Sequence, residues 1–219
     1  MLIFSYDKTL KLLIGFILLL LFSNNSYAHP GRLDKSGCHT DYKNNSYHCH
    51  NQKKDLPKSS TIYDRDSYKH WSDFDKDCQD TRDEVLILHN IGDLKLSEDS
   101  CDVISGLWFD PYSGKEFTNP SDLDIDHIVP LSEADKSGSH NWKEDKKEEF
   151  ANDFENLLPV YSSLNRSKGG KDPNEWMPPN KDYSCKYINS WMYIKNKWQL
   201  SYDNEEVSFL NNFRKECYK

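Results

Sequence analysis

Three short polar segments within residues 126–168 contain side chains that can hydrolyse a phosphodiester. They are Asp126-His127, Asn156 and Asn165-Arg166-Ser167-Lys168. Histidine has an unperturbed pKa near neutral pH, so His127 can act as the general base that deprotonates water. The side-chain oxygens of Asp126 and Asn165 suit a hard divalent cation, which would neutralise charge on the phosphate. These residue types indicate a metal-dependent hydrolase.

The catalytic roles require that the strand carrying Asp126 and His127 ends or bulges there and that the loop after it is held in place. Adjacent residues of a regular strand point to opposite faces, so a strand carrying Asp126 and His127 must end or bulge there. Pro130, three residues further on, favours an early end of the strand. Asn156 can hold a loop in place because its amide both donates and accepts hydrogen bonds.

The elements that would position these side chains have an α+β order with little sheet. We expect a strand at 123–129, a helix near 142–154 and a second strand at 157–161. Upstream, Thr81 and Glu84 form a capping-box pattern that opens a helix, and a turn at 110–114 separates strands at 103–108 and 115–117. Downstream, a short helix at 172–177 and two amphipathic helices end the chain.

Longer stretches of the chain resemble the secreted branch of the HNH endonuclease family. The resemblance is carried by LDIDHIVPLSEADKSGSHNW and FANDFENLLPVYSSLNRSKGGKDPNEWMPP, and extends upstream to DCQDTRDEVL and GLWFDPYSGKEF. With Cys185 and LSYDNEE downstream, it covers roughly residues 77–217. The family implies an α+β fold with a ββα-metal core, flanking helices and disulfide bracing.

The resemblance also assigns roles residue by residue. His127 matches the general base, Asp126 and Asn165 the metal ligands, and Asn156 the residue that orders the loop carrying the histidine. Arg166 and Lys168 are assigned contacts to substrate phosphates. The family implies a divalent metal, with Mg²⁺ as first candidate and Mn²⁺ or Zn²⁺ as alternatives.

The implied substrate is nucleic acid, with DNA as first choice and RNA left open. The chain has 28 basic and 36 acidic residues and a formal net charge of −8, which repels a polyanion at long range. Because no base-reading helix or large basic face is evident, we expect weak sequence preference and binding that falls with salt. An inhibitor protein is a conceivable partner that the sequence does not reveal.

Residues 1–28 have the pattern of a secretory signal peptide. Lys8 and Lys11 precede an apolar run at 12–22, and Ser26-Tyr27-Ala28 has the form of a cleavage site. The run is short of the roughly 20 residues that span a bilayer, so we expect a secreted or periplasmic protein without a membrane contact after cleavage. A Cys/His-rich module and linker at 29–62 would then precede a nuclease domain at 63–219.

All six cysteines follow the predicted cleavage site, and an even count in an exported chain favours disulfides. Local closure suggests the pairs Cys38–Cys49, Cys78–Cys101 and Cys185–Cys217. The first pair belongs to the segment HPGRLDKSGCHTDYKNNSYHCH, which resembles short segments on other exported bacterial proteins. Its cysteines can pair or bind zinc, and its histidines form a second candidate metal site. These histidines are His29, His39, His48 and His50.

A rival function is calcium or zinc binding without catalysis. Asp122, Asp124, Asp126 and Glu133 occupy positions 1, 3, 5 and 12 of an EF-hand loop, and Asp73, Asp75, Asp77 and Glu84 repeat the spacing. Position 6 of such a loop needs glycine for its sharp turn. His127 and Cys78 stand there instead, which favours the nuclease over the calcium-binding alternative.

Overall fold

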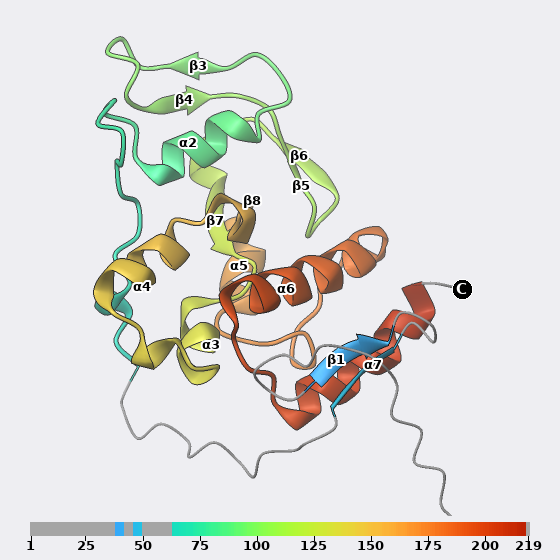
Figure 1. The fold of residues 1–219 in the computed structure, drawn as a ribbon. Helices are drawn as coiled ribbons and strands as arrows, with labels where there is room; N and C mark the ends of the chain where they lie inside the picture. Colours follow the sequence, from blue (N-terminus) through green and yellow to red (C-terminus); the bar gives the residue numbers. More distant parts are fainter. Residues whose placement is uncertain (1–37, 42–45, 50–62, 218–219) are drawn as a thin grey trace, which may run out of the picture. The chain divides into compact units, whose positions relative to one another are not determined.

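The computed structural model describes residues 38–41, 46–49 and 63–217. Within them, helices and short strand pairs give the α+β class that the sequence predicts (Figure 1). The domain boundaries expected near residues 28 and 62 lie outside the described residues. In chain order the helices and strands are β1 (Cys38–Asp41), β2 (Ser46–Cys49), α2 (Thr81–Leu88), β3 (Lys95–Leu96), β4 (Val103–Ser105), β5 (Trp108–Asp110), β6 (Lys115–Phe117), β7 (Leu123–His127), α3 (Leu131–Lys136), α4 (Glu144–Ala151), β8 (Leu157–Tyr161), α5 (Ser162–Lys168), α6 (Ser184–Trp198) and α7 (Asn204–Cys217).

The antiparallel pair β7–β8 lies between the two halves of residues 63–217, and α5 follows β8 directly (Figure 1). The pairing runs from Leu123 opposite Tyr161 to His127 opposite Leu157 without a register shift. Side chains alternate between the two faces of a strand. β7 therefore presents Leu123, Ile125 and His127 on one face, and its two aspartates on the other. The strand ends at His127, two residues before the end of the expected range 123–129, and it forms no bulge there.

Two apolar clusters hold this strand pair from either side. The first joins α2 and the β4, β5, β7 and β8 strands, and its buried members are Val85, Leu86, Val103, Trp108, Leu123, Ile125 and Leu157. The second is larger and is built around α3, α6 and the end of α4, with Trp191, Tyr187 and Phe150 fully buried. Because burial of apolar surface drives folding, these clusters fix where β7 ends relative to α4 and α5.

Three local expectations need correction. The N-cap of α2 is Asp80, whose side chain accepts hydrogen bonds from the Arg82 and Asp83 backbone N–H groups. Thr81, the expected cap, instead donates its hydroxyl to the Ser72 carbonyl. The expected strand at 103–108 is interrupted, so that β4 pairs with β3 and β5 pairs with β6. Residues 172–177 form a turn capped by Asp172 and not a helix.

Disulfides close two of the local loops that the cysteine spacing favours. Cys78 bonds to Cys101 ahead of α2 and β4, and Cys185 at the start of α6 bonds to Cys217 at the end of α7. The second bond joins the two C-terminal helices that the sequence predicts. Among the described residues, no helix is both long enough and apolar enough to cross a bilayer.

Candidate active site

His127 is the last residue of β7, and its ring is held between two partners from distant parts of the chain. Its Nε2 lies 2.8 Å from the carbonyl oxygen of Ala151, at the end of α4. The ring of Trp71 stacks on it with centroids 5.9 Å apart and an interplanar angle of 28°. As a result His127 is only 6% exposed. Trp71 adopts a left-handed backbone with φ 63°, which is costly for a bulky residue and is maintained by its surroundings.

The contact with Ala151 determines which ring nitrogen can act as a base. A carbonyl oxygen only accepts hydrogen bonds, so the hydrogen of neutral His127 is on Nε2 and the lone pair is on Nδ1. Burial lowers the pKa of His127 to about 3, while the Ala151 carbonyl opposes this shift and nearby positive groups reinforce it. The imidazole is therefore neutral at neutral pH, with its lone pair on Nδ1.

Asn156, directly before β8, is hydrogen-bonded to the backbone that follows His127. Its Oδ1 accepts from the Val129 N–H at 2.9 Å, and its Nδ2 donates to the Val129 carbonyl at 3.2 Å. The backbone of Asn156 also accepts a bond from the Ile128 N–H at 2.8 Å. The side chain is fully buried. This is the two-way hydrogen bonding of a loop that the amide was expected to provide, and it fixes the backbone directly after His127.

Asp126 has a buried environment on the opposite face of β7. Its Oδ2 accepts from the Tyr112 hydroxyl at 2.6 Å, and its Oδ1 accepts from the Lys168 ammonium at 2.9 Å. Lys168 also donates to the His127 carbonyl at 2.8 Å. Burial raises the pKa of the Asp126 carboxyl, and the Lys168 charge opposes this shift. The carboxylate is thus oriented by a tyrosine that the sequence did not single out.

Lys168 does not lie where a phosphate contact was expected. It is the last residue of α5 and is fully buried, with its ammonium bonded to Asp126 and the His127 carbonyl. Helix α5 packs on β7, so a long side chain at its end reaches under the strand. Arg166 differs, because its side chain is 76% exposed and lies 3.9 Å from Asp124. Of the two predicted phosphate contacts, only Arg166 is accessible in this structure.

Asn165 is hydrogen-bonded to Asp124, the other aspartate of β7. Its Nδ2 donates to Oδ2 of Asp124 at 3.1 Å. Asp124 and Asp126 are two residues apart on β7 and share the face that α5 covers. The alternation of a strand could have added Asp124 to the candidate site. Trp71 carried no such signal, since it approaches from a segment far away in the sequence. Tyr112 is 14 positions before Asp126, in the turn expected at 110–114, but nothing in the turn pattern indicated a contact with Asp126.

The structure therefore groups the predicted residues around the end of β7 but on two faces. His127, with Trp71, lies on one face, while Asp126 lies on the other with Lys168 and Tyr112. The strand pairing is regular through His127, so the two side chains diverge as alternation requires. Lys168 donates to the His127 carbonyl, and Asn156 holds the loop after the strand, so the backbone around both residues is fixed.

The first EF-hand-like spacing does not form a calcium loop. Residues 123–127 are an extended strand, whereas a calcium loop must wrap around its ion. Two of its supposed ligands are bonded to buried lysines: Asp126 to Lys168, and Glu133 to Lys195 at 2.9 Å. This part of the calcium alternative is contradicted by the geometry.

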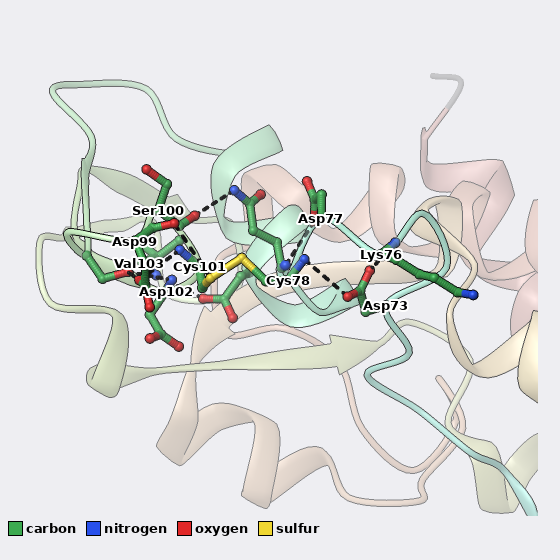
Figure 2. Close-up of a disulfide and its surroundings, with 12 residues drawn as sticks. Asp73, Lys76, Asp77, Cys78, Asp99, Ser100, Cys101, Asp102 and Val103 are labelled. Carbon is green, nitrogen blue, oxygen red and sulfur yellow. Dashed lines mark hydrogen bonds between the residues drawn. A yellow bond between two sulfur atoms is a disulfide. The ribbon is translucent and has the colours of Figure 1, made fainter.

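The second acidic spacing gives an exposed cluster beside a disulfide. Ligand oxygens of Asp73, Asp75 and Asp77 lie within 4.8 Å of one another. Figure 2 shows Asp73 and Asp77 next to the Cys78–Cys101 bond. The carboxylates accept bonds from nearby backbone N–H groups, including the N–H of Cys78 at 3.2 Å from Asp73. These hydrogen bonds are enough to explain the conformation of the loop without a bound ion.

The N-terminal candidates are only partly within the described residues. β1 and β2 form an antiparallel hairpin in which Cys38 is opposite Cys49 and His39 is opposite His48. The Cys38–Cys49 disulfide and the metal site stay predictions. His29 and His50 lie outside the described residues.

Comparison with known proteins identifies the family. The family described as GmrSD restriction endonucleases, C-terminal domain, matches residues 80–207, which include His127, Asn156 and Asn165. A relative from Arthroderma benhamiae, described as an uncharacterized secreted protein, is 39% identical over 157 residues, covering 71% of this chain and 76% of the relative. No solved structure matches the chain. The chain therefore belongs to the GmrSD restriction endonuclease C-terminal domain family, a family of nucleases.

Proposed function

We propose that this chain is a secreted, metal-dependent endonuclease of the HNH type that hydrolyses phosphodiester bonds in DNA. The nuclease family implies a nucleic acid substrate. The antiparallel pair β7–β8 followed by α5 has the order of a ββα-metal core, and the candidate residues come from these three elements and the loops beside them. A relative described as secreted supports export, which the N-terminal pattern also predicts.

The observation that carries the proposal is the hydrogen bond from His127 Nε2 to the Ala151 carbonyl. It holds the ring in one orientation and keeps Nδ1 free of hydrogen. In the proposed reaction, Nδ1 accepts a proton from water, and the resulting hydroxide attacks phosphorus in line with the leaving 3′ oxygen. Asn156 positions the loop after His127.

The donor set on the α5 face fits a hard divalent cation. Asp126 and Asn165 are the proposed ligands, and the contact between Asn165 and Asp124 adds a second carboxylate on the same face. Each carboxylate oxygen has two lone-pair directions, so one hydrogen bond does not exhaust it. Oxygen ligands favour Mg²⁺, with Mn²⁺ next, over metals that prefer nitrogen or sulfur. When bound, the cation would stabilise negative charge on the phosphoryl and leaving oxygens.

Phosphate recognition would rest on a local site because the chain as a whole is acidic. Its net charge of −8 opposes the approach of a polyanion. Arg166 is exposed beside Asp124 and can contact a phosphate oxygen. Because the chain as a whole is acidic, binding should be weak, salt-dependent and little affected by sequence. RNA is the alternative polymer, which only a cleavage assay can separate from DNA.

The direct test is cleavage of supercoiled plasmid and of RNA by the purified mature protein with its disulfides intact. Reactions would contain Mg²⁺, Mn²⁺, Ca²⁺ or EDTA, and would compare wild type with His127→Ala. His140→Ala is a matched control, because His140 also bonds a backbone carbonyl but belongs to the segment after α3 and not to β7. Metal-dependent nicking that disappears only in His127→Ala supports the proposal. A folded wild type that cuts neither polymer with any ion contradicts it.

The rival function is calcium binding without catalysis, and the exposed cluster of Asp73, Asp75 and Asp77 is the observation that favours it. Calorimetry with Ca²⁺ on wild type and on Asp75→Asn would test it in the same preparation. Tight calcium binding that requires Asp75, in a protein without nuclease activity, would establish the rival. If Asp75→Asn retains nuclease activity, the cluster has no part in catalysis.

A further inference from the structure

The hairpin of β1 and β2 places its four chemistry-bearing residues in two adjacent rows. Cys38 is opposite Cys49, and the next row has His39 opposite His48. Thr40 and Tyr47 follow, and then Asp41 opposite Ser46. These residues are separated by only a few positions in the sequence. The sequence does not reveal which of them share a face, because that depends on the register.

The register separates the cysteines from the histidines. Successive residues of a strand lie on opposite faces of the ribbon, while residues directly opposite each other share a face. Cys38 and Cys49 therefore share one face, and His39 and His48 share the other. A tetrahedral site built from all four residues would need ligands from both faces at once. The backbone thus favours a Cys38–Cys49 pair on one face and a separate histidine pair on the other.

The histidine face also carries a carboxylate residue. Asp41 is two positions along β1 from His39, so it lies on the same face and is diagonal to His48. Directly opposite residues have Cβ atoms roughly 5 Å apart, and diagonal neighbours are about 7–8 Å apart. Two imidazoles with one carboxylate form a donor set used for divalent transition metals. One face of the hairpin therefore carries such a set at neighbouring positions of the register.

We propose that this face of the β1–β2 hairpin, which carries His39, His48 and Asp41, binds a divalent transition metal ion, of which Zn²⁺ is the probe of choice. A two-stranded hairpin is marginally stable by itself. A disulfide on one face and an ion on the other would both restrain it, without competing for the same side chains. The site shares no residue with the proposed nuclease site, so either proposal can fail alone.

The test is calorimetric titration of the mature, disulfide-intact chain with Zn²⁺. Wild type should bind one more equivalent than the double variant His39→Ala/His48→Ala. Each single histidine variant should weaken this equivalent at least about tenfold, since loss of even a supporting group costs metal sites roughly 10–100-fold. Asp41→Asn should weaken it less than either histidine variant. Tyr47→Phe, on the opposite face, should leave the affinity unchanged and is the matched control.

Two readouts keep the result interpretable. Nuclease activity and the melting temperature report that each variant is folded, because none of the changes touches β7, β8 or α5. Thiol titration before and after reduction reports the state of Cys38 and Cys49. Equal zinc stoichiometry in wild type and the double variant overturns the proposal. Zinc binding that appears only after reduction and is lost in Cys38→Ser/Cys49→Ser also overturns it, since the ligands would then be thiolates.

Discussion

The ammonium of Lys168 lies 2.9 Å from Oδ1 of Asp126, and both side chains are at most 5% exposed. The same ammonium donates to the carbonyl of His127 at 2.8 Å. One lysine at the end of α5 therefore holds both residues at the end of β7. The pair connects the helix that carries Asn165 with the strand that carries the proposed base.

Replacement of Lys168 by methionine should strongly destabilise the protein. It would leave the Asp126 carboxylate buried without its cation, and breaking a buried ion pair in this way costs about 3–5 kcal/mol of unfolding free energy. Urea denaturation measures the loss. Lys136→Met is the control, because its ammonium is 67% exposed and lies 3.9 Å from Glu133. Exposed pairs contribute up to about 1 kcal/mol, so equal losses in the two variants would contradict the assignment.

In the pH–rate profile of cleavage, the decline at acid pH should occur well below the ordinary pKa of a histidine. Burial lowers the pKa of His127 to about 3, so the ring stays neutral, and able to accept a proton, down to that pH. In the unfolded chain the ring titrates near its ordinary pKa of about 6.5. The stability that neutral His127 contributes is therefore present above that value and is lost as pH falls toward 3.

Trp71→Ala should move that decline to higher pH. Removing the stacked indole exposes the His127 ring to water, which raises the pKa of the imidazole toward its ordinary value. Plasmid cleavage measured from pH 5 to 8 should then decline at the acid end in the variant and stay level in wild type. Trp142→Ala, which removes a tryptophan packed on Trp198, is the control. Parallel profiles for all three proteins would show that Trp71 does not control the base.

Asn156→Ala should lower the cleavage rate more than it lowers substrate affinity. The change leaves the Val129 N–H and carbonyl without their side-chain partner, and each buried unsatisfied group costs about 1–3 kcal/mol. Because the loop begins directly after His127, its displacement should reduce kcat with little effect on KM. Steady-state kinetics and urea denaturation measure the two effects. Asn141→Ala, at an exposed amide beside His140, should change neither quantity appreciably.

Loss of the Cys185–Cys217 disulfide should destabilise the C-terminal helix pair. The bond closes a loop with a sequence separation of 32, and loop entropy predicts a loss of about 3–4 kcal/mol in Cys185→Ser/Cys217→Ser. Cys78→Ser/Cys101→Ser, with a separation of 23, should lose nearly as much, because the entropy depends on the logarithm of loop length. Thermal unfolding of both variants tests this. An unchanged melting temperature in either would contradict it.

The sequence determined the local features of this protein because they depend on neighbouring residues. An early end of the strand was expected from Pro130, and β7 ends at His127. The two-way bonding of Asn156 follows from its amide. The two disulfides within residues 63–217 join cysteines by short loops. Motif resemblance indicated a nuclease, and the family match supports that coarse assignment.

Tertiary structure alone decided how the site is enclosed. Trp71 covers His127, Tyr112 bonds Asp126, and Lys168 is buried under the strand in place of an exposed phosphate contact. The contacts of Trp71 and Lys168 join segments that lie far apart in the chain, whereas the contact of Tyr112 spans 14 positions. Burial and side-chain partners of this kind are set by how α5, β7 and the two apolar clusters pack together, and residue type and spacing carry no signal of that packing.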